Sequence, residues 1–169
     1  MVFCNSYDYS PTTQTLRIRM PSTIHDFFTA KIVREIERRL EQFLSTTPPP
    51  PRNLSTFLLG IENESTSDIF AHDDSDHKRS PDAAFCHPDE QFPGIVVETS
   101  YSQRMGEVER LADEYVMMSN GSIRFIIGLD VDYRGGEGGV DTVSVWRPVR
   151  GEDEERKFLR TECIVDHQV

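Results

Sequence analysis

Asp82 and Glu98 have the residue type and the spacing from which a metal-assisted reaction can be built. Asp82 follows Pro81 at the start of one short apolar run, and Glu98 closes the next run sixteen residues later. If the two runs form neighbouring strands, both carboxylates project near the same end of the sheet, where they repel each other unless a cation or proton lies between them. Carboxylate, carbonyl and water oxygens are the ligands that Mg²⁺ and Mn²⁺ accept, and a bound ion polarises a phosphoryl oxygen. The pair therefore predicts a site for one divalent ion.

Other interpretations of these residue types stay open. An aspartate after a proline is also common in turns, whereas Glu98, at the end of an apolar triplet, is expected close to the core and in need of a partner. The stretch from His72 to His77 has metal-binding residue types but lacks the glycine and glutamate of a calcium loop, so we expect a solvated loop. The glycine-rich segment 134–139 lacks the Lys-Ser/Thr of a phosphate loop, and we expect a flexible turn.

A mixed sheet flanked by helices must position the two acids. Apolar residues recur at helical spacing over Ile24–Leu44, after Ser22 or Thr23 as a cap, and over Met105–Met118, and Asn120-Gly121 closes the second helix as a C-cap pair. We expect the apolar stripe of the first helix to be buried against the sheet: Phe28, Ile32, Ile36, Leu40 and Phe43. Strands are predicted at Leu16–Met20 (or an extended arm), Leu54–Ile61, Ser67–Phe70, Ala83–Phe85, Ile95–Val97, Ile123–Leu129, Val140–Trp146 and Cys163–Val165. The strands that carry the acids form a hairpin, and the order of elements predicts the α/β class with a helix on each side of the sheet.

Four segments follow one another in a recognisable order: Pro81-Asp82, an apolar strand ending in Glu98-Thr99-Ser100, a helix containing Leu111, Ala112 and Tyr115, and Ile126-Ile127-Gly128-Leu129-Asp130. This order resembles the PD-(D/E)XK nuclease superfamily, nearest to its restriction-endonuclease-like proteins of fungi and bacteria. The similarity covers roughly Thr23 to Trp146, and the order of elements carries most of it because the motif is short. It implies a restriction-endonuclease-like αβββαβ core in which Asp82, Glu98 and the backbone carbonyl of Thr99 bind Mg²⁺ or Mn²⁺.

The resemblance also raises the question of the remaining site residues. The family often adds an acid from the first helix, and Glu35 is the best candidate because it lies on the flank of the apolar stripe; an ion pair with Arg39 at the i, i+4 spacing is its alternative role. The family pattern has a lysine two residues after Glu98, but Ser100 stands there. Gln103 or Arg104 would have to replace that lysine, although Gln103 carries no charge and Arg104 is a poor proton acceptor.

Length and composition limit where such a domain works. The 169 residues support one domain, 1–169, and the end of the chain soon after the last predicted strand indicates a longer protein trimmed at its C-terminus. No run approaches the roughly 18 apolar residues of a membrane helix, and the N-terminus lacks the pattern of a secretory signal. Three cysteines without metal-ligand spacing indicate reduced thiols. We therefore expect an intracellular protein, cytoplasmic or nuclear, without membrane contact.

The formal net charge of -11 does not favour nucleic acid as a partner, because proteins that grip phosphates usually present a basic face. A local basic patch, a protein partner and a homodimer stay open. Two main hypotheses follow. The first is a metal-dependent phosphodiesterase in which an ion on Asp82, Glu98 and Glu35 activates water for in-line attack. The second is a non-catalytic nuclease-fold domain that binds a protein or nucleic-acid partner, and an unrelated α/β interaction domain is a third. With Ser100 in the lysine position, catalysis is an open question.

Overall fold

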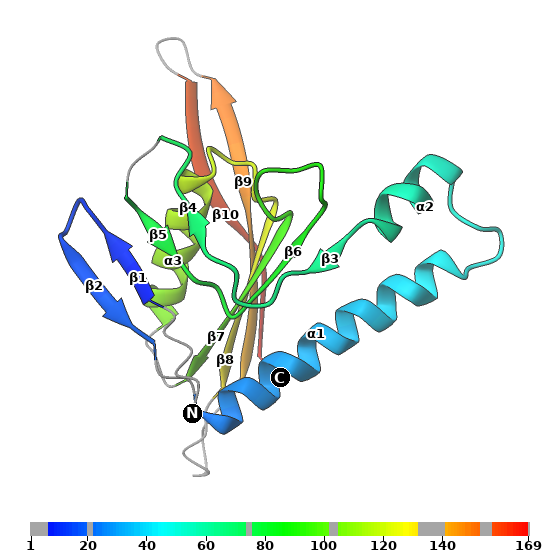
Figure 1. The fold of residues 1–169 in the computed structure, drawn as a ribbon, viewed down its shortest axis with the longest axis horizontal. Coiled ribbons are helices and arrows are strands. Elements are labelled where there is room, and N and C mark those ends of the chain that lie inside the picture. The colour runs from blue at the N-terminus through cyan, green and yellow to red at the C-terminus, as the bar shows by residue number, and fades with distance from the viewer. Residues whose placement is uncertain are drawn as a thin grey trace.

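The computed structural model describes residues 7–19, 22–73, 76–101, 105–131, 141–152 and 157–168. The expected glycine-rich turn at 134–139 lies outside these ranges. Figure 1 shows a large twisted sheet at the centre, a smaller sheet beside it, and a long helix that runs past the edge of the large sheet. Within the described ranges, no helix is both long enough and apolar enough to cross a membrane.

The large sheet has six strands and carries the two acids. Their order is β10 (Lys157–Gln168), β9 (Thr142–Glu152), β8 (Phe125–Val131), β7 (Ile95–Tyr101), β6 (Ala83–Cys86) and β3 (Glu62–Asn63). Strands β7 and β8 are parallel, and the other neighbours are antiparallel. The sheet is therefore mixed, as predicted, and the predicted hairpin is confirmed by β6 and β7.

The small sheet was not foreseen as a separate sheet. Its order is β2 (Thr15–Ile18), β1 (Tyr7–Ser10), β5 (Lys78–Arg79) and β4 (Ile69–Phe70), all antiparallel. Only three residues, Ser80, Pro81 and Asp82, separate the end of β5 from the start of β6, so the chain passes directly from the small sheet into the large one. The hairpin of β1 and β2, which we call the arm (residues 7–19), is thereby held next to Asp82.

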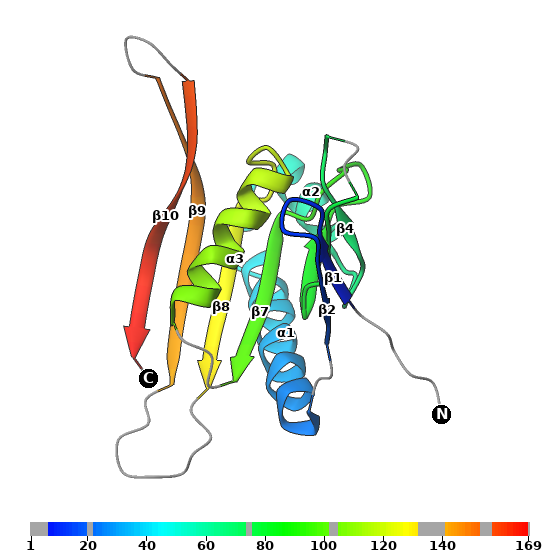
Figure 2. The same ribbon diagram turned by 90° about the vertical axis from the view of Figure 1, so that its left-hand side faces the viewer.

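Two helices cover opposite faces of the large sheet, as predicted (Figure 2). Helix α1 (Thr23–Leu44) packs Val33 onto one face, in a core with Ala83, Phe85, Val97 and Leu129. Helix α3 (Met105–Met118) packs onto the other face, where the core includes Val96, Ala112, Tyr115, Ile126 and Trp146. Because side chains alternate along a strand, successive residues of β7 serve the two cores in turn.

The ends of both helices follow from local sequence. The Ser22 side chain accepts a hydrogen bond from the backbone N–H of His25 at 3.2 Å, which satisfies one of the free donors of the first turn. After α3, Gly121 adopts φ +72° and its N–H donates to the carbonyl of Val116 at 2.8 Å. A glycine is favoured there because other residues reach that conformation only with strain. The predicted C-cap is therefore confirmed.

One expectation about the helical region was wrong, and another was met only in part. The predicted strand Leu54–Ile61 is helix α2 (Arg52–Leu59), which begins directly after a proline and has no buried residue. A short apolar run fits either structure, and prolines before it favour a helix start. In α1, Ile32 and Ile36 of the expected stripe are half-buried against the core that holds Val33, whereas Phe43 is 46% exposed. The reason is visible in Figure 1, where the second half of α1 extends beyond the sheet that was expected to cover it.

Candidate functional site

Asp82 and Glu98 meet at one end of the large sheet. Ala83 pairs with Val97 across the β6–β7 ladder, and the N–H of Asp82 donates to the carbonyl of Val97 at 3.2 Å. In this register Asp82, directly before β6, lies opposite Glu98, the middle residue of β7. The two carboxylates are close enough that one nitrogen, Nη1 of Arg19, contacts both of them, at 3.2 Å from Asp82 Oδ1 and 2.9 Å from Glu98 Oε2. The predicted convergence of the two acids is thus confirmed.

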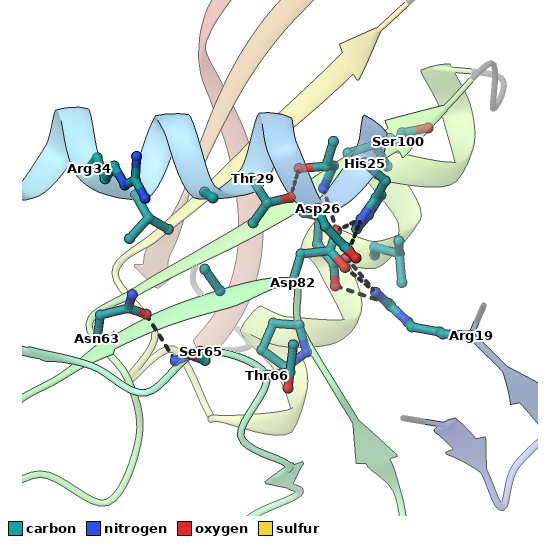
Figure 3. Close-up of a pocket in the computed structure, with 18 of the residues that line it drawn as sticks. Arg19, His25, Asp26, Thr29, Arg34, Asn63, Ser65, Thr66, Asp82 and Ser100 are labelled. Atoms are coloured by element: carbon teal, nitrogen blue, oxygen red, sulfur yellow. Dashed lines mark hydrogen bonds and ion pairs between the residues drawn. The ribbon is translucent and has the colours of Figure 1, made fainter. Parts of the chain in front are cut away.

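The group between the two acids is the guanidinium of Arg19, which the sequence did not single out. Its Nη2 donates to Glu98 Oε1 at 3.1 Å, and its Nε donates to Asp8 Oδ2 at 3.1 Å. Arg19 lies one residue beyond β2, so the arm carries it to the acids, and its side chain is only 17% exposed. Figure 3 shows the Arg19 side chain pointing from the arm to Asp82. Three carboxylates therefore share one arginine.

Further donors engage the same carboxylate oxygens. Asp82 Oδ2 accepts from the backbone N–H of Thr99 at 2.6 Å and lies 3.0 Å from Nε2 of His25. Glu98 Oε1 accepts from the hydroxyl of Tyr115 at 2.5 Å. Together with the contacts of Arg19, these bonds engage all four carboxylate oxygens of the acid pair.

Burial and neighbouring charge shift the pKa values around the pair. Burial raises the pKa of Glu98, and the charge of Asp82 raises it further, although Arg19 opposes both effects. The hydrogen bond with Asp82 is the main cause that raises the pKa of His25 to about 9. His25 is therefore protonated at neutral pH. Burial also raises the pKa of Tyr115 well above its usual range, so that its hydroxyl stays a donor to Glu98.

Asp8 ties this cluster to the rest of the molecule. Its side chain is 1% exposed, its Oδ2 also pairs with Arg79 Nη1 at 3.0 Å, and its Oδ1 accepts from the N–H of Ser80 at 3.1 Å. Arg79 in turn pairs with Glu114 of α3. The ionic network thus links the arm, the strand ends and α3.

Glu35, the candidate third ligand, does not join the acid pair. It lies on the exposed side of α1, where its carboxylate pairs with Arg38 at 2.5 Å and with Arg39 at 2.8 Å. The hydrogen bond from Arg38, followed by the one from Arg39, lowers the pKa of Glu35 to about 2. Because Thr29 and Val33 turn inward on the helix, Glu35 turns outward. The expected ligand role is corrected, and the alternative ion pair with Arg39 is confirmed.

The other expected site residues have mixed outcomes. Thr99 touches Asp82 through its backbone N–H, and its hydroxyl lies 2.9 Å from that of Thr29 in α1. Ser100 is buried, and its hydroxyl has no hydrogen-bond partner in the part of the chain that the structure describes. Gln103 and Arg104 lie outside the described residues.

As arranged, the acid pair does not fit a divalent ion. The oxygens that would bind it already accept from Arg19, Tyr115, Thr99 and His25. Among the described residues, no group of three or more His, Cys, Asp or Glu side chains is arranged to hold a metal. An ion next to the guanidinium would also meet a like charge.

A pocket of about 630 Å³ opens beside the acid pair, between the arm, α1 and the loop after β3. Arg17 and Arg34 line it, and neither forms an ion pair with any residue that the structure describes. Asn63, Ser65 and Thr66 line it from the loop. Figure 3 shows Arg34 and Asn63 at one end of this pocket and the cluster of Arg19, His25 and Asp82 at the other.

The arm residues of this site had one signal in the sequence. Leu16-Arg17-Ile18-Arg19 alternates apolar and basic residues, a pattern that normally turns the apolar side inward. The structure has the opposite orientation, with Leu16 and Ile18 59% and 64% exposed. The reason is electrostatic, because buried carboxylates on the facing strands need cations more than the arm needs apolar burial.

Comparison of the chain with models of protein families, with curated proteins and with solved structures gave no match.

Proposed function

We propose that this chain is a non-catalytic domain with a nuclease-like fold that binds a phosphodiester chain, single-stranded nucleic acid, in the pocket beside the acid pair. One observation carries the proposal: the guanidinium of Arg19 occupies the space between Asp82 and Glu98. When α2 and the strands of the small sheet are set aside, the order α1, β3, β6, β7, α3, β8 supports a restriction-endonuclease-like αβββαβ core.

Two carboxylates in a binding site would repel a phosphate, but Asp82 and Glu98 face two cations, Arg19 and the protonated His25. The negative charges of Asp82 and Glu98 are therefore compensated within the protein. Asp26 and Glu37 also line the pocket, so its acids are matched in number by Arg17, Arg19, Arg34 and protonated His25, in contrast to the overall charge of -11.

Arg17 and Arg34 present guanidinium groups to the pocket without an ion pair among the described residues. Guanidinium, hydroxyl and amide groups are the donors that proteins use on phosphate oxygens. Asn63, Ser65 and Thr66 would supply the same kinds of donor from the loop.

The pocket volume of about 630 Å³ lies in the range of sites for small molecules or single nucleotides, and a duplex would need a broader surface. An extended single strand can place one nucleotide in the pocket and continue past its mouth. Because the rest of the protein repels polyanions, we expect weak binding, with a Kd of about 10⁻⁴ to 10⁻⁶ M at physiological salt.

Fluorescence anisotropy with a labelled single-stranded oligonucleotide tests the proposal. The double variant Arg17→Ala, Arg34→Ala should weaken binding and reduce the slope of log K against log salt concentration by about 1.4, as expected for two lost contacts with single-stranded phosphates. The matched control is Arg38→Ala, Arg39→Ala, which removes the same charge from arginines already paired with Glu35.

Two results would contradict the proposal. An equal loss of affinity in both double variants would show that only overall charge matters, and the pocket would have no special role. Absence of binding by the wild-type chain at low salt, where electrostatic attraction is strongest, would remove the proposed function itself.

A metal-dependent phosphodiesterase is the second candidate, and the convergence of Asp82 and Glu98 is the observation that favours it. Single-turnover cleavage assays of DNA and RNA with Mg²⁺ and with Mn²⁺ decide between the two. We expect no cleavage by the wild-type chain, because Arg19 holds the acids and Ser100 replaces the lysine. Ser100→Lys tests whether the lysine alone was missing. Robust wild-type turnover that disappears in Glu98→Ala would overturn the binding-domain proposal.

A further inference from the structure

The contacts of Arg19 carry an inference that does not depend on any nucleic-acid ligand. We propose that Arg19 is a built-in cation that takes the place of a divalent metal between Asp82 and Glu98, and that the acid pair can bind such a metal only when the arm withdraws this side chain.

The guanidinium of Arg19 contacts both acids directly. It donates through Nη1 to both acids and through Nη2 to the second oxygen of Glu98, at distances between 2.9 and 3.2 Å. The remaining contact, from Nε to Asp8, holds the group in place from the arm side. A metal ion shared by the pair would need oxygens that these bonds now occupy.

Two converging carboxylates require a cation, and arginine supplies one that stays protonated at any ordinary pH. A divalent ion brought beside the guanidinium would be repelled by it, whereas the same ion in its place would be attracted by both acids. Metal and Arg19 therefore exclude each other at this position.

The arm has little strand pairing with the rest of the small sheet. Strand β2 is an edge strand that pairs with β1 alone, and β1 joins the next strand through a single pair of residues, Tyr9 and Lys78. Leu16 and Ile18 of β2 are exposed and add little packing. Arg19 and Asp8 hold the arm by ionic contacts, and Tyr7 of β1 attaches it further, because its carbonyl accepts from Ser80 Oγ and its ring lies under Lys78 Nζ.

Isothermal titration calorimetry with Mn²⁺ tests the inference. The wild-type chain and Arg38→Ala, a control that removes an arginine remote from the acids, should bind no Mn²⁺ at this site. Arg19→Ala should bind one Mn²⁺ measurably, since the repelling guanidinium is gone and Asp82 Oδ1 and Glu98 Oε2 lose the donor that occupied them. The gained site should disappear in the double variant Arg19→Ala, Asp82→Ala.

Folding of the variants is followed by circular dichroism, and Arg19→Gln is a second variant that keeps part of the hydrogen bonding. A variant that unfolds at lower temperature and is restored by Mn²⁺ supports the inference, because the metal then replaces the lost cation. The inference is overturned if the wild-type chain binds Mn²⁺ in a manner that Asp82→Ala abolishes. The inference is also overturned if Mn²⁺ neither binds to Arg19→Ala or Arg19→Gln nor raises the unfolding temperature of either variant. Neither result would bear on oligonucleotide binding.

Discussion

The carboxylates of Asp8, Asp82 and Glu98 tolerate burial because each of them lies within hydrogen-bonding distance of a cation. A buried ion pair adds little net stability over an apolar equivalent, but removal of one partner costs about 3 to 5 kcal/mol because the other charge is left uncompensated. Arg19 is shared by all three acids, so its loss affects each of them. At the scale of residues, the site is a set of mutually dependent charges.

His25 makes the stability of this set depend on pH. Its pKa in the folded chain is raised to about 9, first by the hydrogen bond with Asp82 and then by the charges of Asp82 and Asp26, against a value of 6.5 when unperturbed. A raised pKa in the folded state contributes stability that is complete below pH 6.5 and is lost as pH rises through about 9. We therefore expect the free energy of unfolding by urea to fall over this interval, and His25→Gln to remove that fall.

His72→Gln is the control for this measurement, because His72 is exposed and lies outside the network. It should keep the wild-type dependence on pH. If His25→Gln has the same dependence as the wild-type chain, His25 does not bind Asp82 as a protonated group.

At the scale of elements, the position of the site depends on how closely α3 approaches β8. Gly128 of β8 faces that helix, and a Cβ atom built on it would lie 2.5 Å from Val108 Cγ1 and 2.7 Å from the ring of Trp146. Real Cβ atoms do not approach other atoms so closely. The glycine therefore allows α3 to settle on the sheet, and α3 carries Tyr115 to Glu98.

Gly128→Ala should lower the free energy of unfolding by about 1 to 3 kcal/mol, as expected for overpacking of a close contact. Gly94→Ala is the matched control, since the nearest atom to a Cβ there lies at 4.0 Å. Urea unfolding monitored by circular dichroism compares the two variants. Equal effects would mean that the close approach of α3 to β8 does not govern stability.

At the scale of the whole molecule, the small sheet and the large sheet are joined by ionic contacts and by Ile69 of β4, which is buried in the core on the α3 face. Asp8 belongs to β1, Arg79 to β5 and Glu98 to β7, and the network around Arg19 runs through all three strands. The apolar cores, in contrast, lie mainly on the two faces of the large sheet. The arm is therefore expected to respond to charge changes before the large sheet does.

Asp8→Asn should destabilise the chain by about 3 to 5 kcal/mol, because Arg19 and Arg79 then lose a shared buried partner. Hydrogen exchange measured by mass spectrometry should show faster exchange in β1 and β2, with smaller changes in β8 and β9. Asp89→Asn, at a side chain that is 89% exposed, should alter neither quantity. Uniform acceleration across both sheets would contradict a separately attached arm.

The sequence by itself determined the features that rest on local physics. Helices α1 and α3 follow from apolar periodicity and from their caps at Ser22 and Gly121. The hairpin of β6 and β7 and the meeting of Asp82 with Glu98 follow from two short apolar runs joined by a loop. The run Leu54–Ile61 was ambiguous because it is too short for its periodicity to separate a helix from a strand.

Only the tertiary structure decided what lies between the acids. Arg19 is 63 residues from Asp82 and 79 from Glu98, and no local pattern indicates that a side chain so distant in sequence fills the space between them. Glu35 turned outward because the facing sheet, not the helix alone, selects which side of α1 is buried. A buried charge finds its partner by proximity in the folded chain, since the energy of leaving it unpaired depends on burial that sequence order does not specify.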